Sequence, residues 1–100
     1  MRQRAWQGSF SMPEIILKIQ HVAGLHARPA AMFVQTANQY KSIIKVRYGE
    51  REVNAKSIMG ILTVGASQGA VVTVCAEGED AAQALESLRD LVESNFGEQS

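Results

Sequence analysis

Residues 24–37 read Gly24-Leu25-His26-Ala27-Arg28-Pro29-Ala30-Ala31-Met32-Phe33-Val34-Gln35-Thr36-Ala37. Apolar side chains recur in this segment at the spacing i, i+3, i+4 and i+7: Ala30, Phe33, Val34 and Ala37. This spacing predicts an amphipathic helix from about residue 27 to residue 39. Pro29 fits such a helix only in its first turn, where the missing N–H group has no partner within the helix. His26 therefore lies at the N-terminal edge of the helix, whose apolar face needs another layer to pack against.

Strands are predicted on both sides of this helix. Apolar residues alternate over residues 15–19, which is the period of a strand with one buried face. Alternation over residues 44–48, the tight turn Gly49-Glu50 and residues 51–54 predict a hairpin. A fourth strand is predicted over residues 72–76.

Two further helices follow from capping signals. Ser57 precedes an apolar segment that ends at Gly65, as in a short capped helix. Asp80 is predicted to cap the last helix, with Gln83 three residues later. The order strand, helix, strand, strand, helix, strand, helix predicts a two-layer α+β domain whose sheet carries helices on one face. We assign this domain to residues 12–98 and a flexible N-terminal tail to residues 1–11.

Composition narrows the class of protein. The chain has 100 residues, of which 46% are hydrophobic and 20% charged, as expected for one globular domain. The charges of its ten basic and ten acidic side chains cancel, whereas a nucleic-acid-binding protein usually carries a net positive surface. No apolar run reaches the roughly 20 residues of a membrane span, and none of signal-peptide type follows the basic start. We expect a cytoplasmic monomer without nucleic-acid binding or membrane insertion, in which the lone Cys75 is a small buried side chain.

His26 is the strongest candidate for chemistry. A histidine near a helix start is, by itself, usually a solvated loop residue. His26 differs from such a residue because it lies at a helix N-terminus, where free N–H groups and the positive end of the helix dipole favour a bound anion. An imidazole there is a nucleophile whose phosphorylated form is solvated by backbone donors. Arg28 adds charged donors for the same phosphoryl oxygens.

Two motifs resemble the signatures of HPr, the histidine-containing phosphocarrier of the bacterial phosphoenolpyruvate-dependent sugar phosphotransferase system. The first covers residues 24–31, and the second is Asn54-Ala55-Lys56-Ser57-Ile58-Met59-Gly60-Ile61-Leu62. The resemblance extends from Pro13 to Glu98 and includes the element order. It implies an open-faced β-sandwich with an antiparallel sheet in the strand order 1-4-2-3, which the residue pattern does not distinguish from a ferredoxin-like arrangement.

The resemblance also implies roles for individual residues. His26 matches the residue that enzyme I phosphorylates and that enzyme IIA domains dephosphorylate, and Arg28 matches the arginine that accompanies the phosphoryl group. Ser57 matches the serine phosphorylated by the ATP-dependent HPr kinase/phosphorylase, which adds this kinase and a transcriptional regulator to the expected partners. No cofactor or metal is implied. The matching surface for successive partners comprises Ala31, Ile58, Met59, Leu62 and Gly65.

Several alternatives stay open at this point. An N-cap role alone explains a serine at position 57, and two of the apolar residues that follow it could be core. Related carriers serve nitrogen-related or purely regulatory relays. A small enzyme would use His26 as general acid or base with Arg28 gripping an anion, although no local motif supplies a second catalytic group. A protein-binding module without phosphorylation is the remaining reading.

Overall fold

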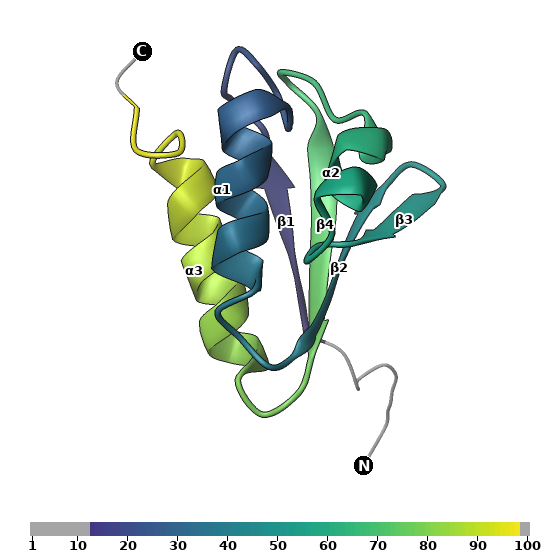
Figure 1. Ribbon diagram of the computed structural model, residues 1–100, viewed down its shortest axis with the longest axis vertical. Coiled ribbons are helices and arrows are strands. Elements are labelled where there is room, and N and C mark those ends of the chain that lie inside the picture. The colour runs from purple at the N-terminus through teal and green to yellow at the C-terminus, as the bar shows by residue number, and fades with distance from the viewer. Residues whose placement is uncertain (1–12, 99–100) are drawn as a thin grey trace.

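The computed structural model describes residues 13–98, so the predicted tail of residues 1–11 lies outside the described residues. Strands and helices follow one another as the sequence predicts (Figure 1): β1 (Glu14–Lys18), α1 (Ala27–Ala37), β2 (Ile43–Tyr48), β3 (Arg51–Asn54), α2 (Ile58–Val64), β4 (Val71–Glu77) and α3 (Ala81–Glu93). The sheet order is β1-β4-β2-β3, and all neighbouring strands are antiparallel. The predicted fold class and strand order are confirmed.

The core lies between the sheet and the helices, which cover one of its faces (Figure 1). Val74 of β4 pairs with Ile15 of β1 and with Val46 of β2, so these side chains share the face under the helices. Phe33 of α1 and Leu88 of α3 are fully buried against that face. The alternation that predicted the strands therefore reflects a sheet that packs against helices on one face only.

Cys75 lies on the opposite face of the sheet, where it pairs with Glu14 and Lys45. It is only 4% exposed, so the prediction of a small buried side chain is confirmed, but outside the main core. Charged side chains surround it: Arg47 lies 3.4 Å from Glu14 and 3.8 Å from Glu52. Burial raises the pKa of the Cys75 thiol, and the positive charge of Arg47 opposes this shift.

The capping prediction for Asp80 is confirmed for its position and wrong for its side-chain hydrogen bond. Asp80 occupies the N-cap position of α3, but its side chain makes no hydrogen bond to that helix. Its carboxylate instead accepts hydrogen bonds from the backbone N–H of Lys41 at 2.9 Å and of Ser42 at 3.0 Å, and from the Ser42 hydroxyl. The reason is tertiary, because the segment before β2 presents three donors to this carboxylate. These bonds lower the pKa of Asp80, with the Ser42 hydroxyl as the largest cause.

Candidate functional site

His26 is the N-cap residue of α1, with extended backbone angles (φ −133°, ψ 165°). Its imidazole is exposed and makes no capping hydrogen bond to the helix. The first turn of α1 contains no acidic residue. The positive end of this helix is therefore free of a negative side chain from its own first turn, and a phosphoryl group on His26 would lie next to it.

The loop before His26 is packed tightly against the segment that follows α2. Leu25 is fully buried, and its N–H donates to the Ala66 carbonyl at 2.8 Å. Gly24 has a φ of +64°, and a Cβ atom there would lie 2.6 Å from the Ala66 oxygen and 2.7 Å from the Ser67 Cα. Only glycine fits this position. The motif glycine thus fixes the backbone two residues before the candidate phosphoryl acceptor.

The backbone directly after His26 is strained. Ala27 has a φ of +51°, a conformation that L-residues with a side chain avoid. Such a residue costs on the order of 1–3 kcal/mol and persists only where its surroundings hold it. Leu25 and Pro29 are both buried and supply that support. His26 is therefore presented by a backbone that is held in place from both sides.

Arg28 lies exposed in the first turn of α1, two residues after His26. The ion pairs within residues 13–98 involve other basic side chains, namely His21, Lys45 and Arg47. As far as the described residues show, the Arg28 guanidinium is available for an anion at the helix N-terminus.

Ser57 is the N-cap of α2, as predicted. Its Oγ accepts a hydrogen bond from the Gly60 N–H at 3.1 Å. The residue before it is tied to the far end of α1, because the Lys56 carbonyl accepts from the Asn38 side chain at 3.1 Å. Lys56 in turn donates to the Tyr40 carbonyl at 2.6 Å. Ser57 therefore lies near the C-terminal end of α1, whereas His26 lies at its N-terminal end.

The exposed face of α2 is apolar. Met59 is 68% exposed, and Ile58 and Leu62 are also exposed, whereas Ile61 and Val64 point into the core. None of the three apolar candidates for docking is therefore a core residue. A contiguous apolar surface of this kind is typical of a protein-interaction site.

The two remaining docking candidates lie beside this face and nearer to His26. Gly65 caps α2 in the left-handed conformation and precedes Ala66, which holds the loop before His26. Ala31 is half-buried on α1, which packs against α2. The apolar face of α2 therefore runs from Ser57 toward the loop that carries His26.

Sequence reasoning missed His21, five residues before His26. This side chain is buried and contacts the C-terminal turn of the chain. No local pattern distinguishes it, and its proximity to His26 is the single signal that could have drawn attention to it.

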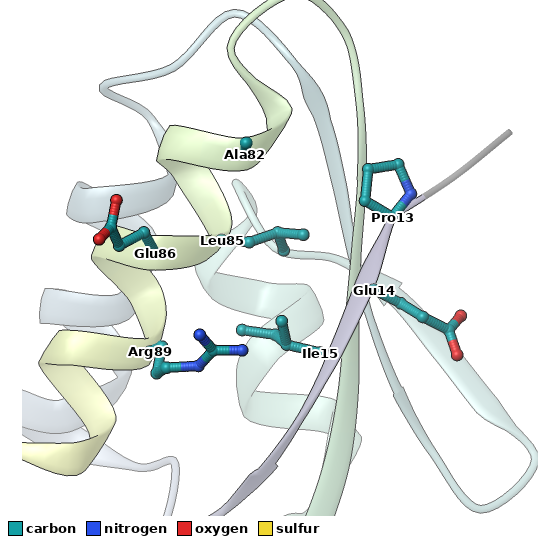
Figure 2. A pocket seen from close by; sticks show the side chains of 7 residues that line it. All are labelled: Pro13, Glu14, Ile15, Ala82, Leu85, Glu86 and Arg89. Atoms are coloured by element: carbon teal, nitrogen blue, oxygen red, sulfur yellow. The ribbon is translucent and has the colours of Figure 1, made fainter. Parts of the chain in front are cut away.

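The candidate site is a surface rather than a cavity. A hollow of about 320 Å³ lies between β1 and α3 (Figure 2), with Ile15 and Leu85 at its base and Arg89 beside them. None of its lining residues is a predicted site residue. Within residues 13–98, no three His, Cys, Asp or Glu side chains gather as metal ligands. No helix of the same region combines the length and the apolar composition that a membrane span requires.

Comparisons with known proteins agree on one family. Residues 14–94 match the family model PTS-HPr, described as the PTS HPr component phosphorylation site. HPr-C-His from Thermoanaerobacter tengcongensis is 52% identical with a TM-score of 0.86, covering 88% of this chain and 99% of that chain. The phosphocarrier protein HPr from Bacillus anthracis is 41% identical with a TM-score of 0.79, covering 82% and 98%. Crh, a Bacillus subtilis catabolite repression protein that forms a domain-swapped dimer, is 43% identical with a TM-score of 0.67, covering 79% and 91%.

Proposed function

The chain belongs to the HPr family of phosphocarrier proteins, and from this premise we propose that His26 accepts a phosphoryl group from enzyme I and passes it to enzyme IIA domains in sugar uptake. A ring nitrogen of the neutral imidazole attacks phosphorus. The new N–P bond forms as the bond between phosphorus and the donor breaks, and the reverse exchange delivers the group to the acceptor. The protein is thus a carrier that returns to its starting state and not an enzyme.

The observation that carries this proposal is the position of His26 at the open N-terminus of α1. The exposed imidazole is free to meet a donor protein, and the helix dipole favours the negative charge that arrives on it. Arg28 offers a second set of donors from the first turn of the same helix. Charge stabilisation and positioning are the main contributions that a protein makes to phosphoryl transfer.

Docking of both partners is assigned to the apolar face of α2, together with Ala31 and Gly65. A surface that serves successive partners must adapt to different shapes, and a flexible methionine such as Met59 suits that demand. This face ends near the loop that presents His26. When a partner binds the apolar face of α2, the imidazole of His26 therefore lies at the edge of the interface.

Ser57 is proposed as a site of regulatory phosphorylation by an HPr kinase/phosphorylase, with a transcriptional regulator as a reader of the modified form. Because Ser57 lies near the C-terminal end of α1 and His26 lies at its N-terminal end, a phosphate on Ser57 does not block the imidazole. It would add a charge of about −2 at the edge of the apolar docking face. The Ser57→Asp variant is expected to slow transfer from enzyme I, and unchanged transfer would contradict this role.

A purely regulatory relay is the second candidate, because the chain is also 43% identical to Crh. A carrier needs a histidine that accepts the phosphoryl group, and the chain has His26 with Arg28 two residues later, which favours the carrier. We assign the carrier to one domain over residues 12–98, acting as a cytoplasmic monomer.

Intact mass spectrometry tests the carrier function directly. The protein is incubated with phosphoenolpyruvate, magnesium and a bacterial enzyme I, and samples are kept out of acid because phosphohistidine hydrolyses there. One added phosphoryl group is expected in wild type and none in His26→Ala. No added mass, with the same enzyme I active on a control carrier, would point to a different donor or to a binding module without phosphorylation.

A further inference from the structure

We propose that His21 is a positioning residue for phosphoryl transfer at His26, and that Glu98 holds it in place. The inference rests on the proposed carrier function. It assigns a role to a buried histidine that neither the docking surface nor the phosphoryl chemistry uses.

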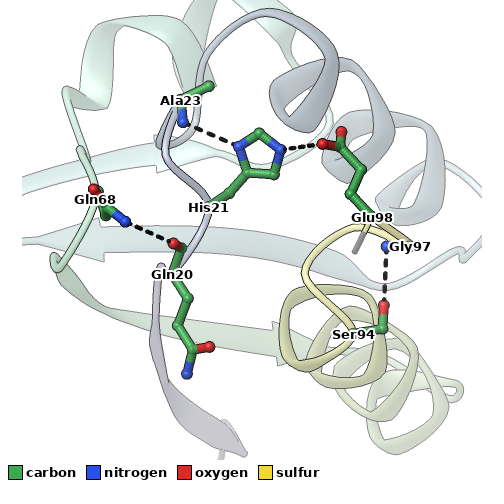
Figure 3. Close-up of polar contacts among 7 residues, drawn as sticks. All are labelled: Gln20, His21, Ala23, Gln68, Ser94, Gly97 and Glu98. Atoms are coloured by element: carbon green, nitrogen blue, oxygen red, sulfur yellow. Dashed lines mark hydrogen bonds and ion pairs between the residues drawn. The ribbon is translucent and has the colours of Figure 1, made fainter. Parts of the chain in front are cut away.

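His21 organises the turn that leads to His26 (Figure 3). Its Nδ1 atom accepts a hydrogen bond from the Ala23 N–H at 3.0 Å, and its own carbonyl accepts one from the Gly24 N–H at 2.9 Å. Two successive backbone donors of the loop therefore end on this one residue. Because Nδ1 is an acceptor, the hydrogen-bond pattern assigns the ring proton to Nε2.

The Nε2 atom points to the opposite end of the chain, where it lies 2.9 Å from the Glu98 Oε1 (Figure 3). Both ring nitrogens are therefore occupied, Nδ1 by a backbone N–H and Nε2 by a carboxylate, and together they fix the orientation of the imidazole. His21 is only 6% exposed, and its ring meets Phe96 edge-on at a centroid distance of 5.8 Å. Glu98 is the ionisable group that faces it within residues 13–98.

The C-terminal turn depends on the same contacts. Asn95, Phe96 and Gly97 have φ values of 57°, 58° and 76° in succession, although two of them are not glycine. Left-handed backbone at such residues is retained only where other contacts hold it. Phe96 is fully buried and Glu98 is paired with His21. These contacts stabilise both the strained C-terminal turn and the loop before His26.

The contacts of His21 reach His26 through the loop of residues 22–25. Gly24 and Leu25 fix the second half of this loop on Ala66, whereas His21 fixes its first half. Loss of the imidazole would leave the Ala23 N–H without its acceptor and allow the loop to move. A misplacement of about 1 Å in a reacting group can cost up to about a hundredfold in rate. Docking on α2 uses other residues, so KM should change little.

The test compares variants of the full chain in steady-state transfer from phosphorylated enzyme I. The His21→Ala and Glu98→Ala variants are expected to lower kcat about tenfold, with KM within about twofold of wild type. Glu98→Gln keeps an acceptor for the Nε2 proton and should restore at least half of the lost kcat. Glu93→Ala removes an exposed carboxylate from α3 and is the matched control. Amide NMR signals of residues 23–26 should shift in the two alanine variants alone.

The outcomes separate position from stability. Rates are measured well below the melting temperature of each variant, and Glu98→Ala decides the question if His21→Ala does not fold. Wild-type kcat in a folded Glu98→Ala or His21→Ala protein would overturn the inference and leave a purely structural role. Failure of wild type itself to accept phosphate, with a control carrier active, would overturn the proposed function and the inference together.

Discussion

Gly24 combines a conformational and a steric requirement at a point two residues from His26. Its φ of +64° resembles the φ of +60° at Gly49 in the hairpin turn, but Gly49 has nothing within 4 Å of its missing Cβ. Gly24 instead approaches the backbone of Ala66 and Ser67. The two glycines therefore share a left-handed backbone conformation, but only Gly24 is crowded by neighbouring backbone atoms.

We predict that Gly24→Ala destabilises the protein more than Gly49→Ala does. The conformational penalty of about 1 kcal/mol applies to both variants. The clash with backbone atoms adds to it at Gly24, where the loop must move and take His26 with it. Urea unfolding of the two variants measures the difference. Equal losses of unfolding free energy would show that the loop yields without cost and that the motif glycine serves another purpose.

At the scale of elements, α3 begins with a carboxylate that stabilises a different part of the chain. Asp80 accepts hydrogen bonds from Lys41 and Ser42, and so it fastens the start of β2 to the start of α3. The pKa of Asp80 is lowered by these bonds from its ordinary value of 3.8. A depressed folded-state pKa means that the stabilisation is present above the unfolded pKa and is lost as pH falls through the folded pKa.

We predict that Asp80→Asn lowers the melting temperature at pH 7 and that this difference shrinks as pH falls below 3.8. Protonation removes the charge from wild type at low pH, so both proteins then carry a neutral side chain. Thermal unfolding by circular dichroism across this range checks the prediction, with Asp90→Asn in α3 as control. A difference that is constant with pH would mean that the charge of Asp80 contributes nothing.

The apolar face of α2 carries the next prediction. Met59 is exposed, so Met59→Glu should leave the melting temperature close to that of wild type. A charge in the centre of a docking contact should lower kcat/KM for transfer from enzyme I by about tenfold or more. Gln83→Glu places the same charge on exposed α3 and should have no such effect. An unfolded Met59→Glu protein would contradict the observed exposure, and a wild-type rate would remove Met59 from the docking surface.

Local patterns predicted these elements well because their causes are local. Alternation over residues 15–19 and 44–48 follows from a sheet with one buried face, and Ser57 and Gly65 end α2 as their capping preferences predict. Asp80 was assigned to the wrong partner because its donors lie 38 and 39 residues away. Sequence spacing carries no sign of such a contact, and the strand order likewise required a family resemblance.

The same limit applies to the candidate site. His26 and Arg28 stand out because a helix start gives them a shared chemical setting, and their relation is visible within three residues of sequence. His21 escapes notice because Phe96 and Glu98, its partners, lie at the other end of the chain. The separation of Ser57 from His26 likewise depends on the contact of Lys56 with Asn38, which packing alone determines.

At the scale of the whole molecule, one chain completes the fold. All five residues of β1 pair with β4, and the backbone ladder continues from Ile19 to Ala70 beyond the end of the strand. Exchange of β1 between two chains, as in a domain-swapped dimer, requires the loop after β1 to open into a hinge. That loop is closed by the hydrogen bonds of His21, Gly24 and Leu25. These bonds favour the closed form, in which β1 pairs within its own chain.

We therefore predict a monomer with a mass of 10.9 kDa in solution. Size-exclusion chromatography with light scattering, at the concentrations used for phosphotransfer, checks this mass. The open face of the sheet offers exposed apolar side chains, including Ile16 and Ile43, through which two copies could instead associate. An Ile16→Lys variant distinguishes the two routes if a dimer is found. A dimer that Ile16→Lys dissociates would assign the contact to the open sheet face, and one that Met59→Glu dissociates would assign it to the apolar face of α2. A dimer that survives both substitutions would mean that the closed loop opens and that β1 is exchanged.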